Sequence, residues 1–113
     1  MIYIENLLSG LEELSSRDFQ ARVWFATGGP EVSSFSECVS QTFDDTGLSD
    51  AIESGSCPIE LSPESFEALK DLDAAVSRVP QGLAPSALLD ASAMKAVRRK
   101  SLLVLKILEQ QYE

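Results

Sequence analysis

The sequence contains no histidine and only two cysteines, and it has no long apolar run. Without histidine, the Cys–His and Ser–His–Asp catalytic arrangements are excluded, together with most structural zinc sites. No apolar stretch approaches the roughly 18 residues that would span a bilayer. The N-terminal stretch carries acids rather than bases near its start, which argues against a secretory or mitochondrial targeting segment. These absences predict a cytoplasmic protein.

The two cysteines, Cys38 and Cys57, are expected to be reduced thiols, because disulfides are rare in the cytoplasm. Cys38 lies within an apolar pattern and is predicted to be a small core residue. With 113 residues and 44% hydrophobic content, the chain is long and apolar enough for one compact domain, predicted to span residues 1–113.

Helical periodicity dominates the sequence and predicts an all-α fold, a single-domain bundle of five to seven helices around a hydrophobic C-terminal helix. The expected helical segments are residues 4–14, 17–27, 35–43, 48–52 and 63–79. Pro85 is then expected to open a short helix, SALLD, which either ends there or runs on into the final helix, up to residue 113. The stretch VWF at 23–25 also suits a strand, but helical signals flank it. In the last helix we expect one apolar stripe formed by Met94, Val97, Leu102, Leu105 and Leu108 and extended by Leu103, Val104 and Ile107. A helix this apolar is expected at the centre of the bundle or in a subunit interface.

Several helix ends carry capping signals. Ser15 or Ser16 is placed to cap the helix expected over residues 17–27. Ser34 and Glu37 have the spacing of a capping box, and Phe35, Cys38, Val39, Thr42 and Phe43 then follow one helical face. Gly47 is placed to end that helix in a left-handed conformation. Ser62 followed by Pro63 marks the start of the next long helix.

Charge is distributed unevenly. The net charge of the chain is −9, but residues 31–73 hold eleven acids and one base, whereas residues 95–106 hold five bases and no acid. The acidic segment disfavours contact with nucleic-acid phosphates and favours a basic protein partner. The alternative interpretation is that the acids keep a small protein soluble.

The acids are densest in FDDTGLSD, residues 43–50, where Asp44, Asp45 and Asp50 surround a glycine. A calcium loop needs oxygen ligands at positions 1, 3 and 5 and glycine at 6, and neither aspartate register provides them. We therefore expect no metal and no cofactor. Paired carboxylates can serve a glycosidase, but that chemistry usually needs an aromatic-lined cleft in a larger scaffold. The sequence therefore predicts a protein that is not an enzyme.

Two other motifs invite a phosphate or nucleic-acid interpretation. GGP at 28–30 lacks the GK[ST] ending of a phosphate loop, so a turn is expected. The bases at 98–100 spread over about 200° of a helix, so they do not form one basic face. Pairing with the acidic segment and helix solubility are the expected roles, and no nucleic acid is expected as a partner.

Asp44 and Asp45 fall at a helix C-terminus, where the macrodipole disfavours acids. Such a placement indicates an interaction role, and a local turn role for one aspartate is the competing explanation.

The stretch RVWFATGGPEVSSFSECVSQTFDDTGLSDAIESG, residues 22–55, resembles small bacterial immunity proteins of contact-dependent growth inhibition and other polymorphic toxin systems. Its tryptophan, its GGPEVSSF turn and cap and its FDD ending carry the resemblance. The resemblance implies a cytoplasmic protein that binds and neutralises a cognate, basic toxin domain.

The candidate partner-binding residues are Glu37, Asp44, Asp45, Asp50 and Glu53, with Glu31 and Glu60 at the rim. Trp24 is a candidate aromatic anchor, and core packing is its alternative role. The alternative function is a self-associating structural or regulatory helical protein, in which the apolar sides of the last helix form a homodimer seam.

Overall fold

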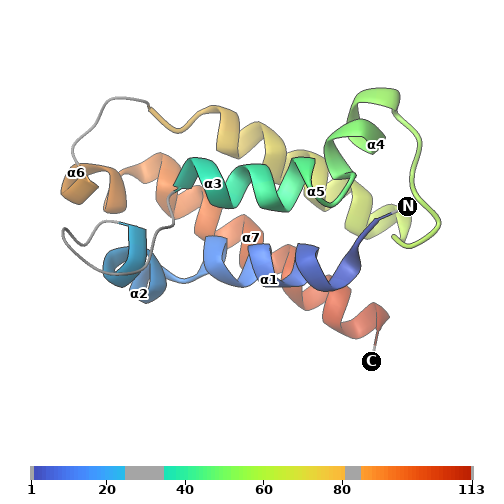
Figure 1. Cartoon of the computed structure of the whole chain (residues 1–113), viewed down its shortest axis with the longest axis horizontal. Helices are drawn as coiled ribbons and strands as arrows, with labels where there is room; N and C mark the ends of the chain where they lie inside the picture. The colour runs from blue at the N-terminus through green and yellow to red at the C-terminus, as the bar shows by residue number, and fades with distance from the viewer. Residues whose placement is uncertain (1, 25–34, 81–84, 113) are drawn as a thin grey trace.

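The computed structural model describes residues 2–24, 35–80 and 85–112, and every regular element within these ranges is helical (Figure 1). The all-α fold is therefore confirmed. The elements, with η for a π-helical turn, are α1 (Ile4–Ser15), α2 (Arg17–Phe19), η1 (Gln20–Trp24), α3 (Phe35–Val39), η2 (Ser40–Asp44), α4 (Leu48–Ser54), α5 (Pro63–Ser77), α6 (Pro85–Leu89) and α7 (Ser92–Gln111).

The C-terminal helix α7 is the centre of the bundle. It is the longest helix, with 20 residues, and it packs most extensively against α1 and α5. In Figure 1, α7 runs behind α1 and α3 along the long axis of the molecule. Burial of a leucine contributes about 1.5–3 kcal/mol, so the three helices are held mainly by their fully buried side chains. These are Leu7, Leu11 and Leu14 of α1, Leu69 and Leu72 of α5, and Met94, Val97, Val104 and Leu108 of α7.

The predicted stripe on α7 was wrong at Leu102. The buried residues of this helix are Met94, Val97, Ser101, Val104, Leu105 and Leu108, whereas Leu102 is 44% exposed. Contact with two neighbouring helices requires steps of three and four residues, and the step from Val97 to Leu102 is five. Ser101 occupies the inward position instead, and Leu102 lies roughly 100° further around the helix.

Most of the predicted helix ends agree with the structure. The Ser16 hydroxyl accepts the Phe19 amide at 3.1 Å, and the Ser62 hydroxyl accepts the Ser65 amide at 3.1 Å. Gly47 has φ of 87°, the left-handed conformation expected there. The capping box cannot be assigned because Ser34 lies outside the described residues, as does the turn at 28–30. The short helix expected at Pro85 is α6, and it ends before Asp90 and Ala91 instead of running on into α7.

Helix α1 crosses the α3–η2 segment at very close range. An added Cβ on Gly10 would lie 2.0 Å from Thr42 Oγ1, so the crossing requires glycine. The buried Cys38 thiol donates to the Gly10 carbonyl at 3.6 Å, and Thr42 Oγ1 donates to the Cys38 carbonyl at 2.7 Å. Cys38 is therefore a core residue, as predicted, and the crossing fixes the position of η2 on the bundle.

Both cysteines are free, Cys38 buried and Cys57 exposed. Among the described helices, none is long and apolar enough to cross a membrane.

Candidate functional site

Four of the predicted acids come together where η2 turns into α4. Asp44 is the last residue of the π-helical turn η2, Asp45 follows it as the C-cap, and Asp50 and Glu53 lie on α4; all four are exposed. We call these four residues the acidic surface. The left-handed Gly47 reverses the chain between the two pairs, so both pairs lie at one corner of the bundle.

The corner is held from beneath by the buried Thr46. Its hydroxyl donates to the Thr42 carbonyl at 2.6 Å and accepts the Leu48 amide at 3.3 Å. Its carbonyl accepts the Tyr3 amide at 3.2 Å, which connects the corner to the start of α1. These bonds occupy backbone groups inside the turn and leave the neighbouring carboxylates pointing outward, so the acidic surface is fixed by the fold.

Asp44 has a local structural role as well. Its carboxylate accepts the Ser49 hydroxyl at 2.9 Å and the Ser40 hydroxyl at 3.3 Å. These two bonds connect η2 to α4, which is the turn role considered as the alternative for one aspartate. An ionised carboxylate has about four acceptor sites, so Asp44 keeps capacity for a partner.

Asp45, Asp50 and Glu53 differ from Asp44, because no ion pair or side-chain hydrogen bond engages them within the described part of the chain. The ion pairs there are Arg17–Asp90, Lys70–Glu67 and Lys100–Asp71. The Lys100 pair confirms the expected contact between the basic stretch of α7 and the acidic segment. Three carboxylates of the acidic surface thus remain uncompensated by a cation.

Asp45 also borders a groove of about 280 Å³ between α1 and η2. Its other lining residues are Asn6, Ser9, Gly10, Glu13 and Gln41. The lining offers two carboxylates, two amides and a hydroxyl, and it contains no cation. Burial raises the pKa of the Glu13 carboxyl above its ordinary value, because desolvation penalises the charged form. The groove is therefore suited to a cationic group.

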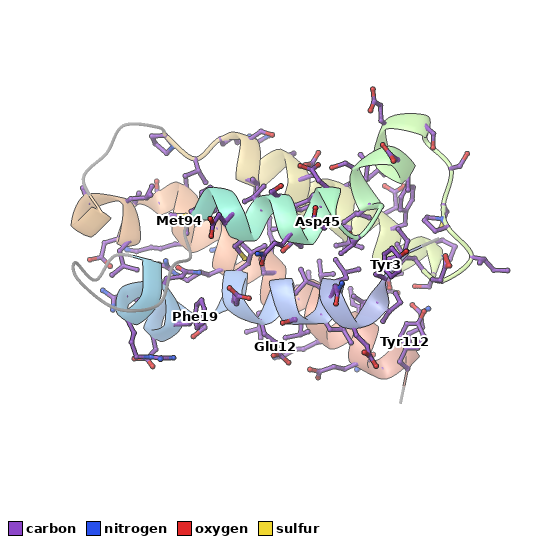
Figure 2. The ribbon with its side chains drawn as sticks, viewed as in Figure 1. Tyr3, Glu12, Phe19, Asp45, Met94 and Tyr112 are labelled. Atoms are coloured by element: carbon purple, nitrogen blue, oxygen red, sulfur yellow. The ribbon has the colours of Figure 1, made fainter. Side chains whose placement is uncertain are left out.

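Figure 2 shows how α1 divides the acids of this part of the molecule. Asp45 lies on the upper side of α1 in this view, toward α3 and α4, whereas Glu12 lies on the lower side. The contribution of α1 to the groove was not among the predicted site residues. The signal was the polar spacing Asn6, Ser9, Gly10 and Glu13, which follows one helical face.

The remaining predicted residues lie apart from this corner or cannot be placed. Glu37 is exposed on α3, two turns before Asp44. Glu60 lies in the loop before α5, where its carbonyl accepts the Gln111 amide at 2.9 Å and the Tyr112 hydroxyl. Glu31 and the side chain of Trp24 lie outside the described residues, so neither can be assigned to the rim or the core.

The chemistry available at the corner is charge and hydrogen-bond acceptance. Among the described residues, no group of three or more Cys, Asp or Glu is placed to hold a metal ion. Burial, with a smaller effect of the Glu13 charge, raises the pKa of the nearby Cys38 thiol to about 12. At neutral pH that thiol is protonated, and a protonated thiol is a poor nucleophile.

Comparison with protein-family models, with curated proteins and with solved structures found no match for this chain. The case for a function therefore depends on the geometry and charge described above.

Proposed function

We propose that this protein is a non-enzymatic acidic binding protein, and specifically a cytoplasmic bacterial immunity protein that neutralises a basic toxin. The observation that carries the proposal is the acidic surface, in which Asp45, Asp50 and Glu53 are exposed and have no cationic partner among residues 2–24, 35–80 and 85–112. Asp45 and Glu53 lie at the C-terminal ends of η2 and α4, where unpaired carboxylates do not stabilise a helix. Asp50 lies in the first turn of α4, where the helix dipole favours an acid, and its carboxylate is exposed. All three carboxylates are available to a basic partner.

The groove beside Asp45 supports the same proposal. A lysine or arginine of the partner would lie between Glu13 and Asp45, where the amides of Asn6 and Gln41 offer carbonyl acceptors. Pairing a half-buried carboxylate with a cation removes part of its desolvation penalty, so this contact would be stronger than an exposed one. Exposed ion pairs contribute only about 0.2–1 kcal/mol each.

Charge also determines the expected kinetics. Complementary surfaces steer association and raise the association rate constant, up to about 10⁸–10⁹ M⁻¹s⁻¹ at low salt. Salt weakens the steering, because the Debye length falls from about 10 Å at 0.1 M to about 3 Å at 1 M. Binding through the acidic surface should therefore depend strongly on ionic strength.

The test is a capture experiment with the wild type and two variants that change the net charge equally. The lysate is that of the source cell, and the product of the neighbouring gene is added to it. The first variant is Asp45→Asn, Asp50→Asn and Glu53→Gln. The control is Glu5→Gln, Glu12→Gln and Glu109→Gln, three exposed acids of α1 and α7. We expect one basic protein to be retained at low salt by the wild type and the control, and lost from the first variant.

Equal loss from both variants would show that only the net charge matters and would contradict a defined surface. The captured protein should also inhibit growth when expressed alone, and co-expression of the wild type should restore growth. A captured protein without toxicity would contradict the immunity role while leaving the binding surface intact.

A second candidate function is self-association through α7, since Leu102 and Leu103 of this helix are 44% and 56% exposed. Lys95, Arg99 and Lys106 are exposed on the same helix. In a symmetric α7–α7 dimer, Arg99 of one copy would approach Lys106 of the other, and like charges oppose such a seam. A salt-insensitive homodimer in analytical ultracentrifugation would favour this candidate over the immunity role.

A further inference from the structure

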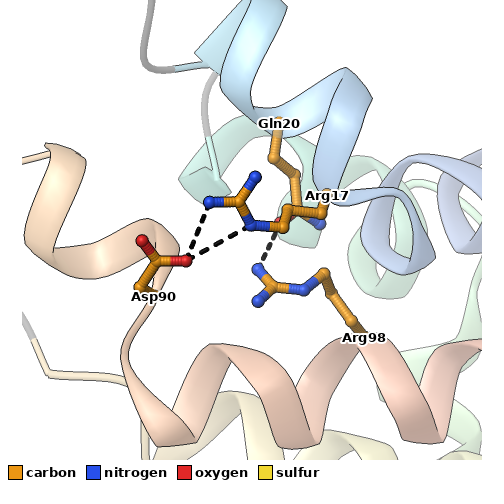
Figure 3. A network of polar contacts seen from close by, with 4 residues as sticks. All are labelled: Arg17, Gln20, Asp90 and Arg98. Atoms are coloured by element: carbon orange, nitrogen blue, oxygen red, sulfur yellow. Dashed lines mark hydrogen bonds and ion pairs between the residues drawn. The ribbon is translucent and has the colours of Figure 1, made fainter.

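A second charged cluster lies where α2 meets the start of α7, and its sign is opposite to that of the acidic surface (Figure 3). Arg17 donates from Nε and Nη2 to one oxygen of Asp90, at 3.2 and 2.9 Å. Arg98 donates from Nη1 to Oε1 of Gln20 at 3.0 Å. Figure 3 shows the guanidinium groups of Arg17 and Arg98 on the same side of Gln20, with Asp90 beside Arg17.

The fold holds Arg98 in place through a neutral group. Gln20 is fully buried, and its amide nitrogen donates to the carbonyls of Glu13 and Leu14 at 3.1 and 2.9 Å. These bonds orient the amide, so its oxygen is aimed at Arg98. The guanidinium thereby gains a fixed position, and within the described residues it forms no ion pair at contact distance. Its hydrogen bond to Gln20 uses one of its five N–H donors. Burial, and then the charge of Arg17, lower the pKa of Arg98.

The cluster has an excess of positive charge. Asp90 interacts with Arg17, Lys95 and Arg98; the hydrogen bond from Arg17 is the largest cause of its lowered pKa. The charges of three cations thus act on one carboxylate, which Arg17 alone contacts, and two positive charges are left uncompensated by the described residues. Asp18, next to Arg17, is exposed and forms no ion pair with the cluster among the described residues. Such an excess is unexpected in a chain with a net charge of −9.

We propose that Arg17, Lys95 and Arg98 form a binding site for a phosphate monoester group, with Asp90 as the internal anion that competes for it. A phosphate dianion matches the two uncompensated charges, whereas a carboxylate matches only one. Guanidinium groups bind phosphate oxygens through paired N–H donors. The first turn of the 20-residue α7 contains no acid, and Ala91 provides no side-chain cap, so the helix dipole adds to the attraction. This site does not depend on the proposed toxin-binding function.

The test is a ¹⁵N NMR titration of the full chain near pH 7.5, with sodium chloride keeping the ionic strength constant. The probes are inorganic phosphate, N-acetyl-phosphoserine methylamide and acetate. We expect saturable shifts of the Arg17 and Arg98 Nε–H signals with both phosphate probes, and binding of acetate about tenfold weaker. A lower dissociation constant for inorganic phosphate would indicate a small-molecule ligand. A lower dissociation constant for the phosphoserine probe would indicate a phosphorylated protein.

Two substitutions are expected to change the affinity for phosphate in opposite directions. Lys95→Gln removes an exposed cation and should weaken binding about threefold or more. Asp90→Asn removes the competing carboxylate and should strengthen binding by a similar factor. Arg78→Gln, which removes an exposed arginine at the end of α5, is the control and should change nothing.

A purely structural network predicts other results. Unsaturable shifts, equal responses to phosphate and acetate, or weaker binding by Asp90→Asn would each overturn the proposal. Because Lys95 and Asp90 are exposed, their variants are expected to fold, and circular dichroism spectra would verify this.

Discussion

Replacing Gly10 with alanine would put a methyl group into the contact between α1 and η2. The new Cβ would lie 2.0 Å from Thr42 Oγ1, 3.0 Å from its Cβ and 3.3 Å from its Cγ2. Thr42 is fully buried, and its hydroxyl is committed to the Cys38 carbonyl at 2.7 Å. The threonine cannot rotate away without losing that bond, so the two elements must separate.

The expected loss of stability follows from two opposing effects. Alanine is favoured over glycine inside a helix by about 0.8–1 kcal/mol. Overpacking a close contact costs about 1–3 kcal/mol, and a broken buried hydrogen bond costs about 1–3 kcal/mol more. We therefore expect Gly10→Ala to lower the free energy of unfolding by about 2 kcal/mol or more. The exposed neighbour Ser9, changed to alanine, should cause little loss.

The assay is urea unfolding followed by circular dichroism for Gly10→Ala, Thr42→Ala and the double variant. Thr42→Ala removes Oγ1 and Cγ2, two of the three atoms that the new methyl group would meet, and Oγ1 is the nearest of the three. The double variant should therefore be more stable than the sum of the two single effects predicts, by about 1 kcal/mol or more. A neutral or stabilising Gly10→Ala would refute the close crossing of α1 and η2.

Two further substitutions, a thiol reagent and a pH series test other parts of the structure. Gln20→Leu leaves Arg98 and the carbonyls of Glu13 and Leu14 without their hydrogen-bond partner. We expect the free energy of unfolding, measured with urea, to fall by about 2–3 kcal/mol. A change below about 0.5 kcal/mol would contradict this role of Gln20. Ser101→Ala should be neutral or should stabilise the protein by up to about 1 kcal/mol, because alanine is the better helix former. The buried Ser101 hydroxyl also has no hydrogen-bond partner among the described residues. A clear loss of stability in the same assay would show an unrecognised partner. Cys57 should react quickly with Ellman's reagent and Cys38 only on unfolding. Burial raises the pKa of Cys38 from 9.0 to about 12, so the thiol loses its proton at a lower pH in the unfolded chain than in the folded one. The free energy of unfolding should therefore fall as the pH rises above about 9. Unchanged stability between about pH 9 and 11 would contradict a buried thiol.

Local signals in the sequence predicted the secondary structure well, because they act within one or two turns. Two helices begin where the hydroxyls of Ser16 and Ser62 accept backbone amides of the first turn. The chain turns after η2 at Gly47, which adopts the left-handed conformation that glycine favours. The clustering of Asp44, Asp45, Asp50 and Glu53 also followed from their closeness along the chain.

Features that depend on long-range packing were missed. Leu102 was placed in the core because its residue type is apolar, whereas the stripe facing both α1 and α5 passes through Ser101. Glu13 was not included among the candidate acids, because its place beside Asp45 depends on the close crossing at Gly10. The pairing of Arg17 with Asp90 spans 73 residues, and no local pattern indicates such a contact.

The acidic surface is the centre of this account, and the most direct measurement is the salt dependence of its affinity. The dissociation constant of the captured basic protein would be measured by calorimetry between about 0.05 and 0.5 M sodium chloride. For the wild type we predict a loss of affinity of about tenfold or more over this range. The Asp45→Asn, Asp50→Asn and Glu53→Gln variant should bind more weakly at low salt and show a flatter dependence. Equal affinities of both proteins at every salt concentration would contradict recognition through the acidic surface.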